Sequence, residues 1–294
     1  MKKQFLIIVT LAASFTLLAG CGQISKEATP NASSPKSNAA SSVQTVSSPT
    51  TSAETAKPEN EYIVIEPGVK KGADGKLHDS FIGGDLSLAV GKPVTLNFYN
   101  YDEGAHTYTS ADLGLNVQIE GSKKKGEPAV TTFTFTPSKE GTFDWLCAVP
   151  CDGDNSQWAM SQDGYMKGKI TVTPVKDHVQ HITMVANADY KLGPDGKMHD
   201  AYTPGDVTVN AGTPVQLTVY HFGKNPHPII SGDLGINLQV TSRKDIGDPG
   251  VFQTTFTADK TGKFEWMCGA PCDGANQGWA MMNDNYMMGY ITVK

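Results

Sequence analysis

The sequence predicts an all-β protein with two tandem Greek-key β-sandwich domains, preceded by a signal peptide and a disordered linker. Three observations lead to this prediction. A pattern of about 110 residues occurs twice without a gap, at a constant offset of 121 residues, which is the separation of His106 and His227. Within each copy, apolar residues alternate with a period of two, which is the period of a half-buried strand. Turn signals rich in Gly, Asp and Pro separate the alternating runs.

The first twenty residues have the pattern of a secretory signal peptide. Lys2 and Lys3 precede an apolar run over residues 5–18, which is too short to span a membrane comfortably. The run ends in Leu-Ala-Gly-Cys, with the cysteine at position 21, and this tetrapeptide resembles the lipobox of bacterial lipoproteins. The resemblance implies removal of residues 1–20 and acylation of Cys21, for example with palmitate. Several acyl chains would hold the protein at the cell membrane, on its extracytoplasmic side. The alternative is an ordinary signal peptide that has a cysteine at this place.

Composition divides the rest of the chain into three segments. Residues 21–59 are rich in Ser, Thr, Ala and Pro and hold almost no large apolar residues, which predicts a disordered tether. The two copies of the pattern follow, and we call them the first repeat (residues 60–174) and the second repeat (residues 180–294). The link between them is short, so we expect the two domains to stay close.

The alternation predicts seven or eight short strands in each repeat, the number expected of a Greek-key sandwich. In the first repeat the clearest runs are residues 86–90, 94–98, 131–135, 142–145 and 169–172, and their counterparts recur in the second repeat. Only the short segment after the second cysteine of each repeat has any helical character.

Charge and motifs exclude several classes of protein. The net charge is -6, whereas a nucleic-acid-binding protein would be expected to carry a basic patch. The sequence has no Gly-x-Ser-x-Gly elbow, no phosphate-binding glycine loop and no His-Glu-x-x-His motif. We therefore expect no nucleic-acid partner, and we expect the chain not to be an enzyme.

Each repeat carries two cysteines four positions apart. They are Cys147 and Cys151 in the first repeat and Cys268 and Cys272 in the second, and Cys21 is the fifth cysteine of the chain. Outside the cytoplasm such a pair can bind a metal, form a disulfide or act as a redox-active dithiol. Sulfur ligands gathered this closely favour copper among the metals. The spacing alone leaves all three interpretations open.

A histidine and a methionine stand in the same order around the cysteine pair of each repeat. In each repeat a histidine precedes the cysteine pair by about forty residues, and a methionine follows the pair just before the last strand. This order resembles that of the cupredoxin superfamily. The resemblance is closer still to the copper-A domain of cytochrome c oxidase subunit II and nitrous oxide reductase. It rests on the Cys-x-x-x-Cys pair, on the Asp-Leu-Gly turn after the histidine, and on a Met that leads through a Gly into the last strand.

The resemblance implies copper as the cofactor and electron transfer as the function. It departs from the family at one ligand, because neither repeat has a histidine between the second cysteine and the methionine. Asp163 and Asp284 stand three residues before that methionine, and each loop is longer by an inserted Trp-Ala-Met. We therefore expect a modified copper-A-like site. Its candidate ligands are His106, Cys147, Cys151 and Met160 or Met166 in the first repeat, and His227, Cys268, Cys272 and Met281 or Met287 in the second.

His78 and His199 lie in equivalent early loops and have two open interpretations. They could be ligands of a further metal site, or their loops could pack against the edge of the sandwich.

Two functional alternatives accompany electron transfer. One is storage of copper, or its delivery to a respiratory oxidase or nitrous oxide reductase. The other is a disulfide-stapled interaction module without metal. The expected partners are the membrane, through the N-terminal lipid, and a respiratory redox protein or a copper-accepting enzyme. Subunit II of an oxidase normally has two transmembrane helices before this domain, whereas this chain shows only a cleavable signal, so we do not expect it to be a structural oxidase subunit.

Overall fold

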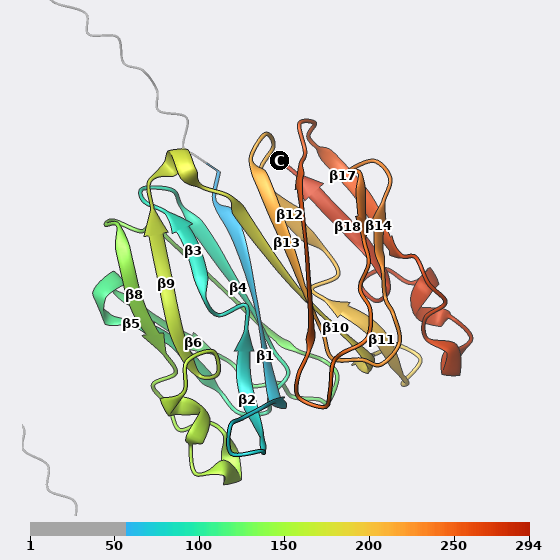
Figure 1. Cartoon of the computed structure of the whole chain (residues 1–294), viewed down its shortest axis with the longest axis horizontal. Helices are drawn as coiled ribbons and strands as arrows, with labels where there is room; N and C mark the ends of the chain where they lie inside the picture. The colour runs from blue at the N-terminus through green and yellow to red at the C-terminus, as the bar shows by residue number, and fades with distance from the viewer. Residues whose placement is uncertain (1–56) are drawn as a thin grey trace, which may run out of the picture. The chain divides into compact units, whose positions relative to one another are not determined.

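A computed structural model describes residues 57–294, and Figure 1 shows two β-sandwiches, one from each repeat. The predicted all-β class is confirmed, and each repeat forms a sandwich of two sheets. All helical segments within residues 57–294 are 3-10 turns of three or four residues. None of the described helices has the length and hydrophobicity that crossing a membrane requires. The signal peptide, Cys21 and most of the tether lie outside the described residues.

The first repeat consists of a four-stranded and a five-stranded sheet. The four-stranded sheet has the order β2-β1-β4-β7, formed by β1 (Glu59–Lys71), β2 (Leu77–Ile82), β4 (Val94–Asn100) and β7 (Ala129–Phe135). The five-stranded sheet has the order β3-β9-β8-β5-β6, formed by β3 (Leu86–Ala89), β5 (His106–Ser110), β6 (Leu115–Ile119), β8 (Gly141–Leu146) and β9 (Lys167–Thr173). The 3-10 turns of the first repeat are η1 (Ala111–Leu113), η2 (Gly153–Asn155) and η3 (Trp158–Ser161).

The second repeat has the same two sheets in the same strand order. The four-stranded sheet, β11-β10-β13-β16, is formed by β10 (Gln180–Leu192), β11 (Met198–Thr203), β13 (Pro214–His221) and β16 (Gly250–Thr257). The five-stranded sheet, β12-β18-β17-β14-β15, is formed by β12 (Val207–Val209), β14 (Ile229–Ser231), β15 (Ile236–Leu238), β17 (Gly262–Cys268) and β18 (Met288–Val293). Its 3-10 turns are η5 (Gly274–Asn276) and η6 (Trp279–Met282), and η4 (Val175–Asp177) lies in the link between the repeats.

Each repeat has nine strands, more than the seven or eight expected, and the long strand β1 shows why. Ile63 and Ile65 point into the core of the first repeat, whereas Tyr62 and Val64 pack with the core of the second repeat. Both faces of β1 are therefore buried, so its sequence lacks the alternation of apolar and polar residues by which a half-buried strand is recognised. The pairing of β1 with β4 is parallel, which is also the arrangement of β10 with β13.

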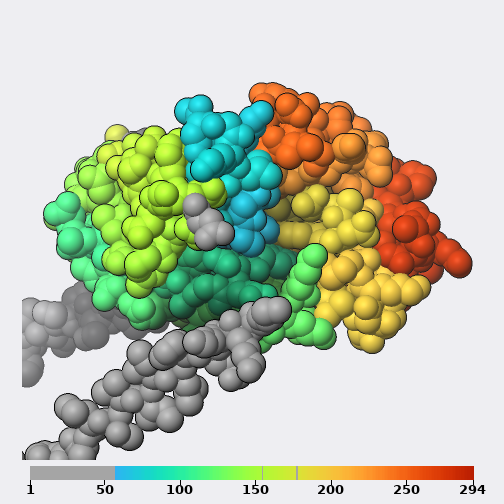
Figure 2. Space-filling model, turned by 90° about the horizontal axis from the view of Figure 1, so that it is seen from below, coloured from blue at the N-terminus to red at the C-terminus, as the bar shows by residue number. Residues whose placement is uncertain are grey.

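The two repeats contact each other through equivalent elements. The backbone N–H of Lys71 donates to the carbonyl of Gly247 at 2.9 Å, and the N–H of Leu192 donates to the carbonyl of Gly126 at 3.0 Å. Lys71 and Leu192 are equivalent residues of the two repeats, and so are Gly126 and Gly247. Each repeat therefore donates one of the two bonds and accepts the other, as at a two-fold symmetric interface. Gly126 has a φ of 79°, and a Cβ there would lie 2.8 Å from the nitrogen of Leu192, so only glycine fits. Figure 2 shows the first repeat, in blue to yellow-green, lying directly against the second, in gold to red.

A tryptophan fills the centre of each sandwich. Trp145 on β8 is 1% exposed, and its ring stacks on Tyr108 with 4.7 Å between the centroids. Its indole N–H donates to Asp85 at 3.2 Å, so its polar atom is satisfied as well. Trp266 occupies the same place in the second repeat, and its N–H donates to the Gly205 carbonyl at 2.8 Å.

We predict that Trp145→Ala lowers the free energy of unfolding by about 3–5 kcal/mol, because it empties a filled core site. Urea unfolding followed by circular dichroism measures the loss. Val130→Ala on β7 is the matched control, since Val130 is 55% exposed, and it should change the stability by no more than about 0.5 kcal/mol. Equal effects of the two substitutions would contradict this account of the core.

Candidate metal centre

In the first repeat, one histidine and two cysteines converge below the surface. The Nδ1 atom of His106 lies 3.1 Å from the sulfur of Cys151 and 3.8 Å from the sulfur of Cys147, and the two sulfurs are 2.7 Å apart. The exposed fractions of these residues are 2%, 1% and 6% for His106, Cys147 and Cys151. One ligand atom from each residue therefore faces a common point within the protein, and all of them lie within 4.8 Å of one another.

Strand pairing brings these distant residues together. His106 is the first residue of β5, and Cys147 follows directly after β8. These two strands are antiparallel neighbours in the five-stranded sheet, with Thr109 opposite Leu146. The backbone N–H of Thr107 points at the sulfur of Cys147, at 3.5 Å. An N–H aimed at the sulfur stabilises a thiolate, which is the form that binds metal.

The two methionines of the first repeat have different surroundings. Met160 lies on η3 and is partly buried, and its sulfur accepts a hydrogen bond from the N–H of Cys151 at 3.4 Å. Met166 is fully buried in the core, and its carbonyl accepts from the N–H of Cys147 at 2.8 Å. Both therefore border the cysteines, Met160 through its sulfur and Met166 through its backbone.

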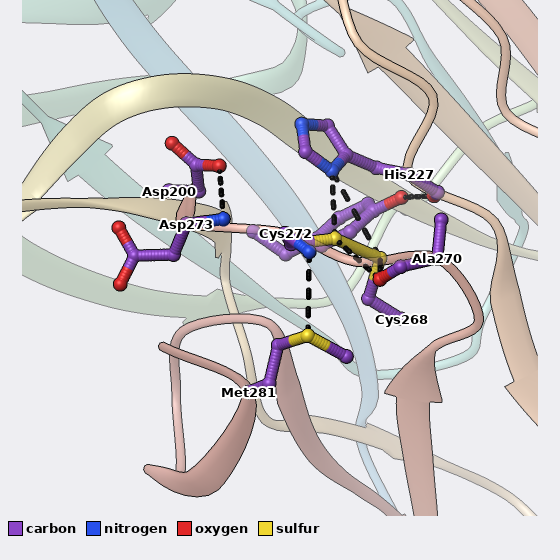
Figure 3. Close-up of a disulfide and its surroundings, with 8 residues drawn as sticks. Asp200, His227, Cys268, Ala270, Cys272, Asp273 and Met281 are labelled. Carbon is purple, nitrogen blue, oxygen red and sulfur yellow. Dashed lines mark hydrogen bonds between the residues drawn. A yellow bond between two sulfur atoms is a disulfide. The ribbon is translucent and has the colours of Figure 1, made fainter. Parts of the chain in front are cut away.

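The second repeat reproduces this arrangement. His227 Nδ1 lies 3.1 Å from the sulfur of Cys272, and the N–H of Cys272 donates to the sulfur of Met281 at 3.3 Å. Figure 3 shows His227 on one side of the sulfur pair and Met281 on the other. Met287 is fully buried, and its carbonyl accepts from the N–H of Cys268 at 2.7 Å. The expected ligands of both repeats thus gather at one place each, and their role as ligands stays a prediction.

The state of the cysteines differs between the repeats. Cys147 and Cys151 are free thiols, whereas a disulfide joins Cys268 and Cys272. The Cα atoms of Cys268 and Cys272 are 7.3 Å apart, which is wider than the roughly 4.4–6.8 Å that disulfides usually span. The backbone spacing therefore suits two thiolate ligands of one metal better than it suits a structural disulfide.

Charge at the first centre favours a thiolate. Burial lowers the pKa of His106, but hydrogen bonds with Asp102 and Cys147 outweigh it and raise that pKa to about 9. A hydrogen bond from the Cys151 thiol lowers the pKa of the Cys147 thiol, and burial opposes this. The same pairing raises the pKa of Cys151. The pair thus loses its first proton easily, and a cation that replaces the remaining protons would stabilise the second thiolate.

The second centre has a neutral histidine. Burial, and then the neighbouring His221, lower the pKa of His227 to about 4. A neutral imidazole is the form in which histidine binds a metal.

A buried aspartate anchors the loop that follows the cysteines. In the first repeat, Asp152 accepts hydrogen bonds from His78 Nδ1 at 2.8 Å and from the N–H of Ala159 at 3.0 Å. Its own N–H donates to Asp79 at 2.9 Å, which ties the loop to β2. The second repeat has the same bonds from His199 and Ala280 to Asp273, at 2.8 and 3.0 Å. This aspartate therefore places both the second cysteine and the turn that carries Met160 or Met281.

The two histidines expected in early loops lie on strands instead, His78 on β2 and His199 on β11, and neither has a free ring nitrogen for a metal. His78 is fully buried, its Nε2 pairs with Asp74 at 2.9 Å, and Trp158 stacks on its ring at 4.2 Å between centroids. Of the two interpretations left open by the sequence, the structure thus favours packing. The sequence did not predict that His78 anchors, through Asp152, the loop that follows the cysteines. The Asp-Gly-Lys-x-His-Asp motif, present in both repeats, was the available signal.

Comparisons with known proteins find distant structural likeness only. No family model matches the chain, and no curated protein matches it. Among solved structures, a copper nitrite reductase from Nitrosomonas europaea has 13% identity and a TM-score of 0.30, over 81% of this chain and 94% of its own. A blue copper oxidase from the same organism has 15% identity and a TM-score of 0.28, over 81% and 86%. A multi-copper oxidase from Pseudomonas thermotolerans has 10% identity and a TM-score of 0.30, over 82% and 65%.

These comparisons correct one expectation. The prediction that the chain is not an enzyme is wrong by these findings, because the matched structures are named as a reductase and two oxidases. The absence of familiar catalytic motifs did not justify that prediction, because motif searches miss redox centres built from dispersed ligands. At identities of 10–15%, the likeness carries none of their reactions over to this chain.

Copper is the cofactor that the donor atoms fit. Each centre offers two cysteine sulfurs, one imidazole nitrogen and a nearby thioether, all buried or partly buried, and the sulfurs of Cys268 and Cys272 can act as thiolates once their disulfide is reduced. Thiolate and thioether sulfur select Cu(I), and imidazole accommodates both oxidation states of copper. The residues His106, Cys147 and Cys151, and His227, Cys268 and Cys272, would hold the ion, with the methionines alongside.

We predict that His78→Gln destabilises the metal-free protein in a pH-dependent way. Burial lowers the pKa of His78, but its bonds to Asp74 and Asp152 outweigh it and raise that pKa, so its contribution is complete below about pH 6.5 and is lost as the pH rises through the folded-state value. Burial raises the pKa of Asp152, but hydrogen bonds from Ala159 and His78 lower it overall, so that contribution is lost only in acid, below about pH 4. The stability difference from wild type should be largest near pH 5–6 and should shrink toward pH 9.

Urea unfolding at a series of pH values measures this difference. Lys176→Gln, at an exposed lysine of the link, is the control and should give a flat profile. A difference for His78→Gln that does not vary between pH 5 and pH 9 would show that the histidine acts only through packing.

Proposed function

We propose that both centres bind copper and that the chain transfers electrons through modified copper-A-like sites. The observation that carries this proposal is the convergence, twice in one chain, of two buried cysteine sulfurs, a histidine Nδ1 and a methionine sulfur. The donors come from three separate segments, yet the fold holds them together through backbone and carboxylate hydrogen bonds. Such pre-organisation keeps the ligands in place when the metal changes its oxidation state, as electron transfer needs.

We further propose that this function is exercised at the outer face of the cell membrane. The support is the lipobox-like sequence that ends at Cys21, followed by a tether of low hydrophobicity. A lipid-modified Cys21 would hold the two copper centres within reach of a membrane-bound respiratory redox protein.

Copper storage or delivery is the second candidate. It is favoured by the donor set, because two thiolates and a thioether suit Cu(I), the oxidation state in which copper is exchanged between sulfur sites. The partner would then be an apo-enzyme that accepts copper. Binding of Cu(I) only, with transfer to such an acceptor, would support this candidate, and a reversible couple with both oxidation states bound supports electron transfer.

We predict that Cys147→Ser removes about half of the bound copper, because it destroys the first centre and leaves the second intact. Copper analysis after loading, together with the visible absorption of the oxidised protein, measures the loss. Met282→Leu is the control, because Met282 is 74% exposed, and it should keep full loading. A wild-type protein that takes up no copper after reduction and loading would overturn the proposal.

A thiol count on the metal-free, unreduced protein tests the remaining alternative. We expect two reactive thiols, those of Cys147 and Cys151, before reduction, and four once mild reduction has opened the Cys268–Cys272 disulfide. Two stable disulfides in their place would identify a disulfide-stapled module.

A further inference from the structure

The two centres differ just beyond the histidine ligand. In the first repeat, the Nε2 atom of His106 pairs with the carboxylate of Asp102 at 2.9 Å. The equivalent of Asp102 in the second repeat is Gly223, which has no side chain. The Nε2 atom of His227 is buried and, within residues 57–294, has no hydrogen-bond partner. The ligand atoms of the two centres are thus the same, but the group behind the imidazole is not.

A second histidine occupies the vacated space. His221 stands where the first repeat has Asn100, it is fully buried, and its ring centroid lies 5.0 Å from that of His227, with the rings nearly perpendicular. A Cβ at position 223 would lie 2.7 Å from the Nε2 atom of His221, so the imidazole and a side chain at 223 exclude each other. The Asn100–Asp102 pair and the His221–Gly223 pair are therefore two alternative fillings of one space.

The hydrogen bond of His221 identifies its tautomer. Its Nδ1 atom lies 2.5 Å from the carbonyl oxygen of Thr241. A carbonyl only accepts, so Nδ1 carries the proton, and in a neutral ring Nε2 is then a bare acceptor. Asn100 donates to the equivalent carbonyl, that of Glu120, at 3.0 Å. His221 thus preserves this bond of the first repeat and turns a neutral acceptor nitrogen into the space beside His227.

We propose that these positioning groups give the two copper centres different reduction potentials. Asp102 lowers the reduction potential of the first centre, and His221, which carries no negative charge, leaves the reduction potential of the second centre higher. The inference rests on the copper binding proposed above. A metal ligated through Nδ1 leaves the proton on Nε2, and the partner of that proton tunes the ligand. The carboxylate of Asp102 brings a negative charge to the buried ligand, which makes it more basic and stabilises Cu(II). The neutral nitrogen of His221 brings none, so Cu(I) is relatively favoured at the second centre. Each centre takes up one electron on reduction, and the histidine protons stay in place.

The test measures each centre alone in the full chain. Cys268→Ser silences the second centre and Cys147→Ser the first, and a redox titration with mediator dyes follows the visible absorption of the remaining one. We expect the ratio of reduced to oxidised copper at a common applied potential to be at least about tenfold higher at the second centre, which is about 59 mV for a one-electron couple. Equal ratios at the two centres would overturn the inference while leaving copper binding intact. Failure of both centres to bind copper would overturn the proposed function and this inference together.

Exchange of the positioning groups supplies opposite shifts that a loss of folding would not produce. Asp102→Asn keeps a hydrogen-bond acceptor without the charge. It should raise the ratio of reduced to oxidised copper at the first centre by about tenfold at a common applied potential. The double variant His221→Asn with Gly223→Asp gives the second centre the arrangement of the first. It should lower the ratio of reduced to oxidised copper at the second centre by a similar factor. The reciprocal double variant, Asn100→His with Asp102→Gly, tests the first centre if the other pair does not fold. Val251→Ala, at a half-exposed residue of β16, is the control and should shift neither centre. Loss of copper from the His221→Asn, Gly223→Asp variant, with the potential of the first centre unchanged, would show His221 to be a ligand and would overturn the proposal.

Discussion

A buried carboxylate beside the second cysteine holds each centre together. Asp152 and Asp273 accept hydrogen bonds from a histidine on β2 or β11 and from the turn that carries a methionine sulfur. Two segments far apart in the sequence, the strand that carries the histidine and the loop that follows the cysteines, are thereby joined at one aspartate. A buried charge is costly unless it is paired and hydrogen-bonded, and here the bonds that satisfy it are also the bonds that place the ligands. Neutralisation of this carboxylate would therefore loosen the metal centre as well as the fold.

The strands and the ligands could be predicted from the sequence to different degrees. Period-two alternation was sufficient for strands such as β4 and β9, which have one face in the core. It failed for β1, because Tyr62 and Val64 are buried against the other repeat while Ile63 and Ile65 are buried in their own. A contact between repeats leaves no periodic signal in either of them. Only the structure could show that β1 serves two cores.

The candidate ligands could be named from type and order, because His106, Cys147 and Cys151 follow the order of a known family and recur 121 residues later. The groups behind them could not be named. Asp102 lies only four residues before His106, yet nothing in the sequence says that its carboxylate turns back to the imidazole. The two methionines could not be ranked either, because Met160 approaches the cysteines through its sulfur and Met166 through its carbonyl. These distinctions depend on side-chain direction, which spacing does not encode.

The duplication makes the protein its own control. Both repeats share the sheet order, the central tryptophan, the aspartate anchor and the donor atoms, so a difference between the centres has to arise outside these shared features. The exchange of Asn100 and Asp102 for His221 and Gly223 is such a difference, and it changes a charge next to a buried ligand. A charge acts strongly on a nearby buried group, because little water lies between them to screen it. The sulfur of Met282, by contrast, is exposed and surrounded by solvent. Two ligand-identical centres can thus be given distinct electronic properties by a pair of substitutions that leaves the fold of the repeat unchanged.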